Sequence, residues 1–398
     1  MAERTPVRTD AGDGSCRNAQ GDAPNERQQV RRRPDPVLVT GANGYVASWL
    51  VKRLLELGFD VHATVRDPRD PRKTGHLNAI AQGCPGTLTF FEADLLDPGG
   101  FNRPMEDCTL VFHTASPLIV RDVDDPVRDL IEPATFGTRH VLDAANRTPS
   151  VRRVVLTSSI VAVYGDAADL ADIEEDRFDE THWNTTSTEH HQPYARSKTL
   201  AERLAWKMAG EQERWDLVVV NPGLVLGPGL SPHTAAEGVL VMLDLGSGYY
   251  GFGAPELEFA IVDVRDVAEG HLRAGLMPEA SGRHVLVSES LGLVEIARVL
   301  RDHFGDGFPF PRRTVTNTVA LMLAPRRGIP QAVAKRNLGY PLRFSNRRAR
   351  EALGMTFRPA AESVVEHFQQ LLDDGLVVGV GRGRSVSAST PPRPGSRG

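Results

Sequence analysis

A hydrophobic run over residues 37–40 leads directly into a glycine-rich turn, which is followed by an amphipathic stretch over residues 48–57. The turn has the spacing G-x-x-G-x-x-A over residues 41–47, and the final alanine suits a place where helix and strand pack closely. Glycines let the backbone turn tightly, and free amides at a helix start attract phosphate groups. A second strand pattern over residues 60–65 completes a βαβ unit. This order predicts a dinucleotide-binding site rather than an ordinary strand-to-helix turn.

Strand patterns recur further along the chain, near residues 88, 109, 153 and 216, with helical patterns between them. Strands that alternate with helices predict an α/β fold of the Rossmann type, with a doubly wound parallel sheet.

We assign residues 35–226 mainly to this dinucleotide-binding domain. Beyond Gly227 the pattern becomes irregular, so residues 227–376 are expected to form mainly a smaller substrate-binding lobe, with some segments returning to the first domain. Residues 1–34 and 377–398 are poor in large apolar side chains, which predicts two disordered tails.

Tyr194 and Lys198 lie four residues apart, so on a helix they would project from the same face. A cation beside a phenol stabilises the phenolate and would lower the tyrosine pKa from its usual value of about 10. Such a pair can act as a general acid/base, although a chance pair on a solvated helix is the alternative. The hydroxyl triplet 157–159 ends the strand pattern near 153, and we choose Ser159 as the group that hydrogen-bonds a substrate carbonyl.

The residues after the second strand bear on the choice of dinucleotide. A base there accommodates the 2′-phosphate of NADP, whereas an acid receives the ribose hydroxyls of NAD. We interpret Arg66 and Lys73 as a phosphate clamp, which predicts NADPH. Asp67 could instead receive the ribose hydroxyls of NAD. The remaining alternative is that these charged residues only form a solvated loop and bind no coenzyme. Asp60 lies at the wrong end of the sheet for this role.

Seven segments occur in one order along the chain: VTGANGYVASWLVKRLLELGFDVHATVRDP, FEADLLD, VFHTASP, RRVVLTSS, YARSK, VVVNPGLVLGP and VDVRDVAEGH. Together they resemble the extended short-chain dehydrogenases/reductases of the NAD-dependent epimerase/dehydratase superfamily, in particular the dihydroflavonol reductase and cinnamoyl-CoA reductase group, over about residues 35–376. The resemblance implies that Ser159, Tyr194 and Lys198 are catalytic. It also implies a cofactor site formed by Gly41, Asn43, Gly44, Tyr45, Val46, Arg66, Lys73, Asp94, Leu95, Thr114, Ala115, Ser116, Tyr194, Lys198, Pro222, Gly223, Leu224 and Val225.

The chain also departs from the plant members. Ile160 and Val161 replace small residues, and the stretch over residues 166–191 is polar and unfamiliar, so a flavonoid substrate is not implied. Sugar-nucleotide dehydratases carry an Asp-Glu pair at this strand end, and its absence argues against dehydration. His190 and His191 are interpreted as exposed residues at the rim of the pocket rather than metal ligands.

These observations predict an NADPH-dependent oxidoreductase that acts on a CH-OH group or the corresponding ketone or aldehyde. One alternative is an NAD-dependent sugar-nucleotide epimerase. The other is a non-catalytic NADPH-binding regulatory protein, against which an intact set of three catalytic residues argues.

Composition sets bounds on partners. The formal net charge of -5 disfavours a nucleic-acid partner, and the longest apolar runs are too short for a membrane span. Cys16, Cys84 and Cys108 lack the spacing of a metal site and are odd in number, which favours a reducing cytoplasm. We therefore expect a cytoplasmic monomer or homodimer that holds no metal and binds a small-molecule carbonyl substrate.

Overall fold

The computed structural model describes residues 35–116, 124–231 and 237–377. Its larger sheet has seven strands in the order β3-β2-β1-β4-β5-β6-β9, and every neighbouring pair is parallel. In chain order these strands are β1 (Val37–Thr40), β2 (Asp60–Val65), β3 (Thr87–Glu92), β4 (Leu110–His113), β5 (Arg153–Thr157), β6 (Asp216–Pro222) and β9 (Gly282–Leu286). The strand order reverses beside β1, and ligands of such sheets bind at the carboxyl edge near that point.

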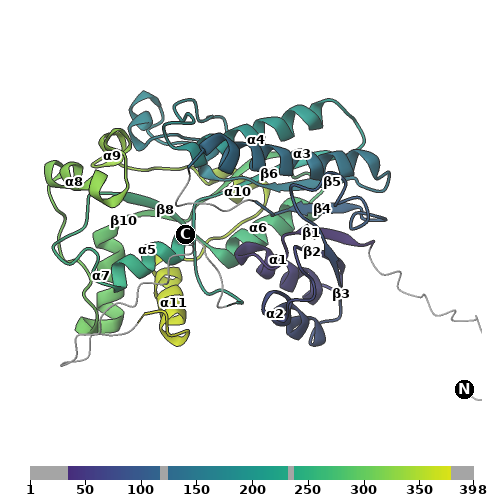
Figure 1. Ribbon diagram of the computed structural model, residues 1–398, viewed down its shortest axis with the longest axis horizontal. Coiled ribbons are helices and arrows are strands. Elements are labelled where there is room, and N and C mark those ends of the chain that lie inside the picture. Colours follow the sequence, from purple (N-terminus) through teal and green to yellow (C-terminus); the bar gives the residue numbers. More distant parts are fainter. Residues whose placement is uncertain (1–34, 117–123, 232–236, 378–398) are drawn as a thin grey trace, which may run out of the picture. The chain divides into compact units, whose positions relative to one another are not determined.

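Helices cover both faces of this sheet (Figure 1). They are α1 (Tyr45–Glu56), α2 (Pro71–Gln82) and α6 (Val264–Leu276) on one face, and α3 (Glu132–Arg147) and α4 (Pro193–Gly210) on the other. Side chains of β6 alternate between the two cores: Val218 and Val220 pack on the first face, Leu217 and Val219 on the second. The predicted doubly wound α/β fold is therefore confirmed.

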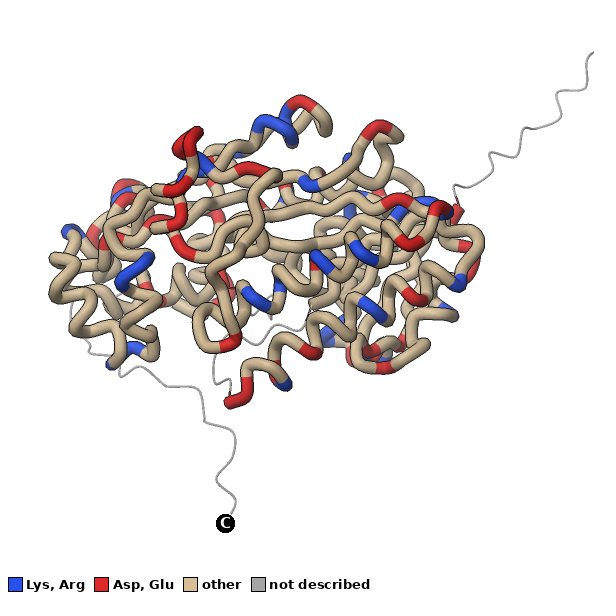
Figure 2. Tube along the Cα trace, turned by 90° about the horizontal axis from the view of Figure 1, so that it is seen from above, with Lys and Arg blue, Asp and Glu red and all other residues tan. Residues whose placement is uncertain are grey.

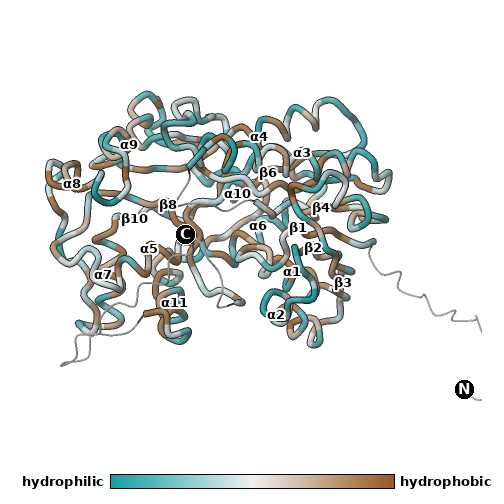
Figure 3. Tube along the Cα trace, in the orientation of Figure 1, coloured by the Kyte–Doolittle hydropathy of each residue, from teal (hydrophilic) through white to brown (hydrophobic). Residues whose placement is uncertain are grey.

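A second sheet has three strands in the order β10-β8-β7. They are β7 (Leu224–Leu226), β8 (Glu258–Asp263) and β10 (Glu289–Gly292), with β7 parallel and β10 antiparallel to β8. The remaining α-helices are α5 (Glu237–Gly246), α7 (Leu293–Phe304), α8 (Asn317–Leu323), α9 (Gln331–Asn337), α10 (Arg347–Ala352) and α11 (Ala360–Asp373). In Figure 3 the helices alternate between hydrophobic and hydrophilic residues along their length, as expected when one side of each is buried.

Short helical turns complete the described chain. They are the π-helical turn η1 (Val127–Ile131) and the 3-10 turns η2 (Ile160–Ala162), η3 (Ala167–Asp172), η4 (Gly305–Gly307) and η5 (Ala324–Arg327). Strand β9 and helix α6 come from the region assigned mainly to the substrate lobe, yet both pack with the large sheet. The exact division of the chain into two lobes stays a prediction.

The two predicted tails lie outside the described residues, except Val377, which is buried. Cys16 also lies outside them, while Cys84 and Cys108 are free thiols. None of the described helices is long and apolar enough to cross a membrane. Figure 2 shows acidic and basic residues interspersed along the chain.

Candidate active site

The glycine-rich turn lies at the carboxyl end of β1, where backbone geometry leaves no room for a side chain. Gly41 has a φ of +62°, and a Cβ there would lie 3.0 Å from the Cα of Ala115. Thr40 Oγ1 accepts hydrogen bonds from the amides of Thr114 (3.1 Å) and Ala115 (3.0 Å), which ties the turn to the loop after β4. Helix α1 starts here with no side-chain cap among the described residues, so its first amides fit a phosphate.

Several predicted cofactor residues meet at this edge although they come from distant segments. Leu95, Ala115, Ser116 and Lys198 line one pocket. Pro222 ends β6 at the same edge as the other carboxyl ends of the sheet.

Other predicted cofactor residues have structural contacts of their own. A Cβ on Gly223 would lie 2.2 Å from the carbonyl oxygen of Ala260, so the backbone approaches closely there. The hydroxyl of Tyr45 donates to the carbonyl of Gly227, and Asp94 Oδ1 accepts from its own turn, from the amide of Leu96 at 2.8 Å. Asn43 lies within the glycine-rich turn and Val46 in the first turn of α1, while Leu224 and Val225 lie in β7.

The charged residues that bear on coenzyme choice lie in and just after the loop that follows β2, and they have different contacts. Asp67 Oδ1 accepts from the amide of Arg69 at 3.0 Å and also lies 3.6 Å from that residue's Nε. Arg66 is exposed, and no ion pair or hydrogen bond engages it within the described chain. Lys73 Nζ lies 3.9 Å from a carboxylate oxygen of Asp70. The acid beside the predicted clamp is thus occupied by a neighbour, whereas Arg66 can turn toward a ligand.

Asp60, by contrast, is the first residue of β2 and accepts from Thr87 Oγ1 at 2.5 Å, far from the carboxyl edge.

The three hydroxyls at the end of β5 differ in what they contact. Thr157 Oγ1 lies 2.7 Å from His271 Nε2, and Ser158 Oγ donates to a buried carboxylate, Glu202 Oε2, at 2.5 Å. Ser159 is half-buried and caps the following turn, where its Oγ accepts from the amide of Val161 at 3.3 Å. Thr157 and Ser158 therefore have buried partners, although both also line the pocket that contains Ser116 and Lys198. Ser159 does not line that pocket, so its predicted contact with a substrate carbonyl stays a prediction.

Tyr194 and Lys198 lie in the first two turns of α4, as the spacing predicted. Lys198 Nζ lies 5.9 Å from the centroid of the Tyr194 ring and donates to Ser116 Oγ at 3.0 Å. Burial lowers the pKa of Lys198 to about 8, against the opposing attraction of Glu202.

The expected lowering of the Tyr194 pKa is wrong for this structure. Burial, and then the Glu237 carboxylate, raise the pKa of the phenol well above its usual value. The ammonium of Lys198 points to Ser116 rather than to the phenol oxygen, and sequence spacing alone could not reveal the burial that dominates.

Sequence reasoning missed a buried ion pair behind these residues. Glu202 is fully buried, and its Oε1 accepts from Arg283 Nε at 2.6 Å. Asn221 Nδ2 donates to Glu202 Oε2 at 2.8 Å and to the backbone carbonyl of Ser159 at 3.1 Å. This network fixes the end of β5 against α4. The spacing of Lys198 and Glu202, four residues apart on the same helix, was the available signal.

The two histidines before Tyr194 have different environments. His190 is exposed as expected, but His191 is mostly buried, with Nε2 2.8 Å from Asp166 Oδ2. Within the described residues, no cluster of three or more His, Cys, Asp or Glu side chains could hold a metal ion.

Comparisons with known proteins agree with the geometry. Residues 37–288 match the model of the NAD dependent epimerase/dehydratase family. The chain is 38% identical over 341 residues to cinnamoyl-CoA reductase CAD2 of Medicago truncatula, covering 84% of this chain and 95% of that protein. It is 36% identical over 286 residues to tetraketide alpha-pyrone reductase 1 of Arabidopsis thaliana, covering 70% and 83%.

A solved structure shows the same fold: yeast methylglyoxal/isovaleraldehyde reductase Gre2, complexed with NADPH, matches with a TM-score of 0.67 and 26% identity over 86% of this chain and 100% of that one. The match of the family model to most of the chain and the similarity to full-length reductases together show that this protein belongs to the NAD dependent epimerase/dehydratase family, in its group of dihydroflavonol and cinnamoyl-CoA reductase relatives.

Proposed function

We propose that the protein is an NADPH-dependent reductase that converts a ketone or aldehyde to an alcohol, and that can run in reverse on a CH-OH group. The observation that carries the proposal is that Lys198, four residues after Tyr194 on α4, lines a pocket at the carboxyl edge together with Ala115 and Ser116. Ser159 Oγ accepts from the amide of Val161, which leaves its own proton for a ligand. Relatives named as reductases support the same reaction class.

Three side chains have distinct roles in this reaction. Tyr194 donates its phenolic proton to the carbonyl oxygen, which becomes the hydroxyl of the product. Ser159 donates a hydrogen bond to that oxygen as negative charge develops on it. Lys198, which donates to Ser116 Oγ in this structure, would donate to a ribose hydroxyl and carries its positive charge 5.9 Å from the centroid of the Tyr194 ring. NADPH, when bound, supplies the hydride that reaches the carbonyl carbon.

The residues at the carboxyl edge fit this coenzyme. The uncapped start of α1 and the tight turn at Gly41 would hold the pyrophosphate. Arg66 and Lys73 would hold the 2′-phosphate, and Arg69 engages one carboxylate oxygen of Asp67, the competing ribose ligand. The yeast reductase matched above was crystallised with NADPH.

Replacing Tyr194 by Phe tests the proton donor directly. Tyr194→Phe should lower kcat by about a hundredfold or more while leaving NADPH affinity nearly unchanged, because only the hydroxyl is lost. Tyr164→Phe is the matched control: its ring packs 5.3 Å from that of Phe178, and it has no lysine four residues later. Turnover by Tyr194→Phe at the wild-type rate would remove this residue from the mechanism.

The substrate class is best approached with a panel. Oxidation of NADPH, followed by its absorbance, should proceed with some ketones or aldehydes, and acyl-CoA thioesters and dihydroflavonols belong in the same panel. Absence of turnover with every compound, together with tightly held NAD that is released only on denaturation, would favour the sugar-nucleotide epimerase instead.

A further inference from the structure

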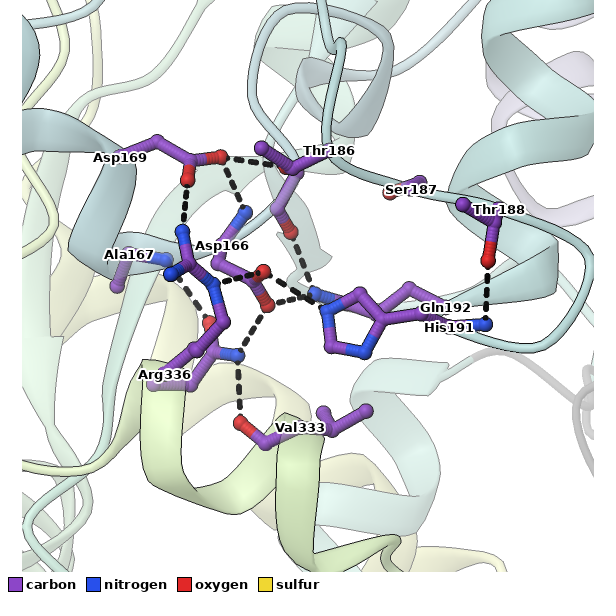
Figure 4. Close-up of polar contacts among 12 residues, drawn as sticks. Asp166, Ala167, Asp169, Thr186, Ser187, Thr188, His191, Gln192, Val333 and Arg336 are labelled. Atoms are coloured by element: carbon purple, nitrogen blue, oxygen red, sulfur yellow. Dashed lines mark hydrogen bonds and ion pairs between the residues drawn. The ribbon is translucent and has the colours of Figure 1, made fainter.

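Asp166 is a buried carboxylate outside the predicted site, and its two oxygens are fully engaged by four side chains. Oδ2 accepts from Arg336 Nε at 2.7 Å and lies 2.8 Å from His191 Nε2. Oδ1 accepts from Gln192 Nε2 at 2.7 Å and from Asn337 Nδ2 at 2.8 Å. Figure 4 shows Arg336 and His191 pointing toward Asp166 from two different segments. Burial opposes the charge, but these hydrogen bonds keep the pKa of Asp166 below its usual value.

One side of this cluster belongs to α9. Arg336 also donates through Nη2 to Asp169 Oδ1 at 2.5 Å, so its planar guanidinium bridges two carboxylates. Asn337 Oδ1 accepts from the amide of Ala167 at 2.9 Å. Helix α9 lies in the region predicted to form the substrate lobe, and it is about 170 residues away along the chain.

The other side belongs to the start of α4. Gln192 has a left-handed backbone, with φ of 55°, and is the residue immediately before the helix. Its side chain donates to Asp166 and to the carbonyl of Gly165 at 2.5 Å, and its own carbonyl accepts from the amide of Arg196 at 3.0 Å. Tyr194 follows two residues later, so the position of the phenol depends on how Gln192 is held.

The loop beneath the cluster is closely packed at Gly165. A Cβ on Gly165 would lie 1.9 Å from Thr186 Oγ1, which itself donates to Asp169 Oδ2 at 2.6 Å. Two segments of the loop are therefore packed against each other where Asp166 meets both helices.

We propose that Asp166 is a positioning residue that couples α9 to the N-terminus of α4. This coupling fixes the position of the Tyr194 phenol relative to the substrate side of the site. The inference rests on the proposed function for its kinetic consequence, but the coupling itself is a property of the fold. Misplacing a reacting group by a fraction of an ångström slows a reaction without removing any catalytic group.

The test removes the contact between α9 and Asp166 and measures the effect at the start of α4. Arg336→Met keeps the aliphatic stem but removes the guanidinium, and it should increase amide hydrogen exchange in the first turn of α4. With an active substrate it should lower kcat about tenfold and leave NADPH affinity within twofold. Arg336→Lys, which keeps the charge without the planar fork, should recover part of the loss.

Arg343→Met is the matched control, because Arg343 also pairs the same loop with the C-terminal part of the chain, through Asp176, but makes no contact with Asp166. It should leave exchange in α4 and kcat as in the wild type. Unchanged exchange in α4 and unchanged kcat for Arg336→Met, or equal effects of both variants, would overturn the inference. Failure of Tyr194→Phe to slow turnover would instead refute the proposed function, while the exchange result would still decide the coupling.

Discussion

Lys198 should reduce the stability of the protein, so Lys198→Met should fold more stably while losing activity. The side chain is 8% exposed, and burial lowers the pKa from its usual 10.5 to about 8. Between these two pKa values the unfolded chain binds more protons than the folded one, so stability rises with pH across this window. Below about pH 8 the folded state carries the full penalty of burying the ammonium.

The magnitude follows from the two pKa values. A difference of about 2.5 units at about 1.36 kcal/mol per unit gives a penalty of roughly 3 kcal/mol near pH 7. At about pH 9.5 much of the lysine is neutral in the folded state, and the same linkage leaves roughly 1.4 kcal/mol. The lost hydrogen bond to Ser116 subtracts about 1 kcal/mol. Lys198→Met should therefore gain about 2 kcal/mol near neutrality and almost nothing at about pH 9.5.

Urea unfolding of the ligand-free protein at both pH values measures this difference. Lys207→Met is the control, because Lys207 lies on the same helix with 73% of its side chain exposed and should change stability by less than about 0.5 kcal/mol at either pH. Turnover and NADPH affinity should fall for Lys198→Met alone. A Lys198→Met protein that is less stable than wild type near pH 7, or a gain that does not shrink at high pH, would refute the reasoning.

Two other perturbations have defined outcomes. Replacing both Arg66 and Lys73 by Ala removes two charge-assisted contacts of about 1.5 to 3 kcal/mol each, so preference for NADPH over NADH should fall roughly a hundredfold or more, mostly in KM. Equal use of the two coenzymes by the wild-type protein would count against the clamp. Glu202→Gln leaves Arg283 buried without a full counter-charge and should destabilise the protein by about 3 kcal/mol or more. Adding Arg283→Met should restore part of that stability in urea unfolding, and no recovery would contradict the ion-pair explanation.

Local patterns predicted the elements of the sheet well because each depends on neighbours in sequence. The turn at Gly41 and the strand at 153–157 are examples. Strand β9 was not anticipated, because it joins β6 only after the chain has passed through β7 and β8 of the second sheet. Nothing in its five residues indicates which strand they pair with.

Side-chain burial and contacts in the candidate site were also hard to predict, because they depend on segments distant in sequence. The spacing of Tyr194 and Lys198 predicted that they would be neighbours, but the direction of the tyrosine pKa depends on burial, which spacing does not report. The contacts of Asp166 likewise join residues from the loop before α4 and from α9. Polar residues in an irregular loop look solvated until the partner segment is known, and His191 was misread for that reason.

Helix α4 buries two opposite charges, and their different partners explain why only one of them is free to respond to a ligand. Glu202 receives hydrogen bonds from Arg283, Asn221 and Ser158, so its negative charge is already balanced. It therefore compensates Lys198 only weakly, and Lys198 donates to a neutral hydroxyl while its pKa stays low. A ligand that accepts a hydrogen bond from this ammonium stabilises the charged form. Binding therefore offsets part of the free-energy cost of burying the ammonium on folding. The Lys198 ammonium is thus poorly solvated at the place where the coenzyme ribose is proposed to bind.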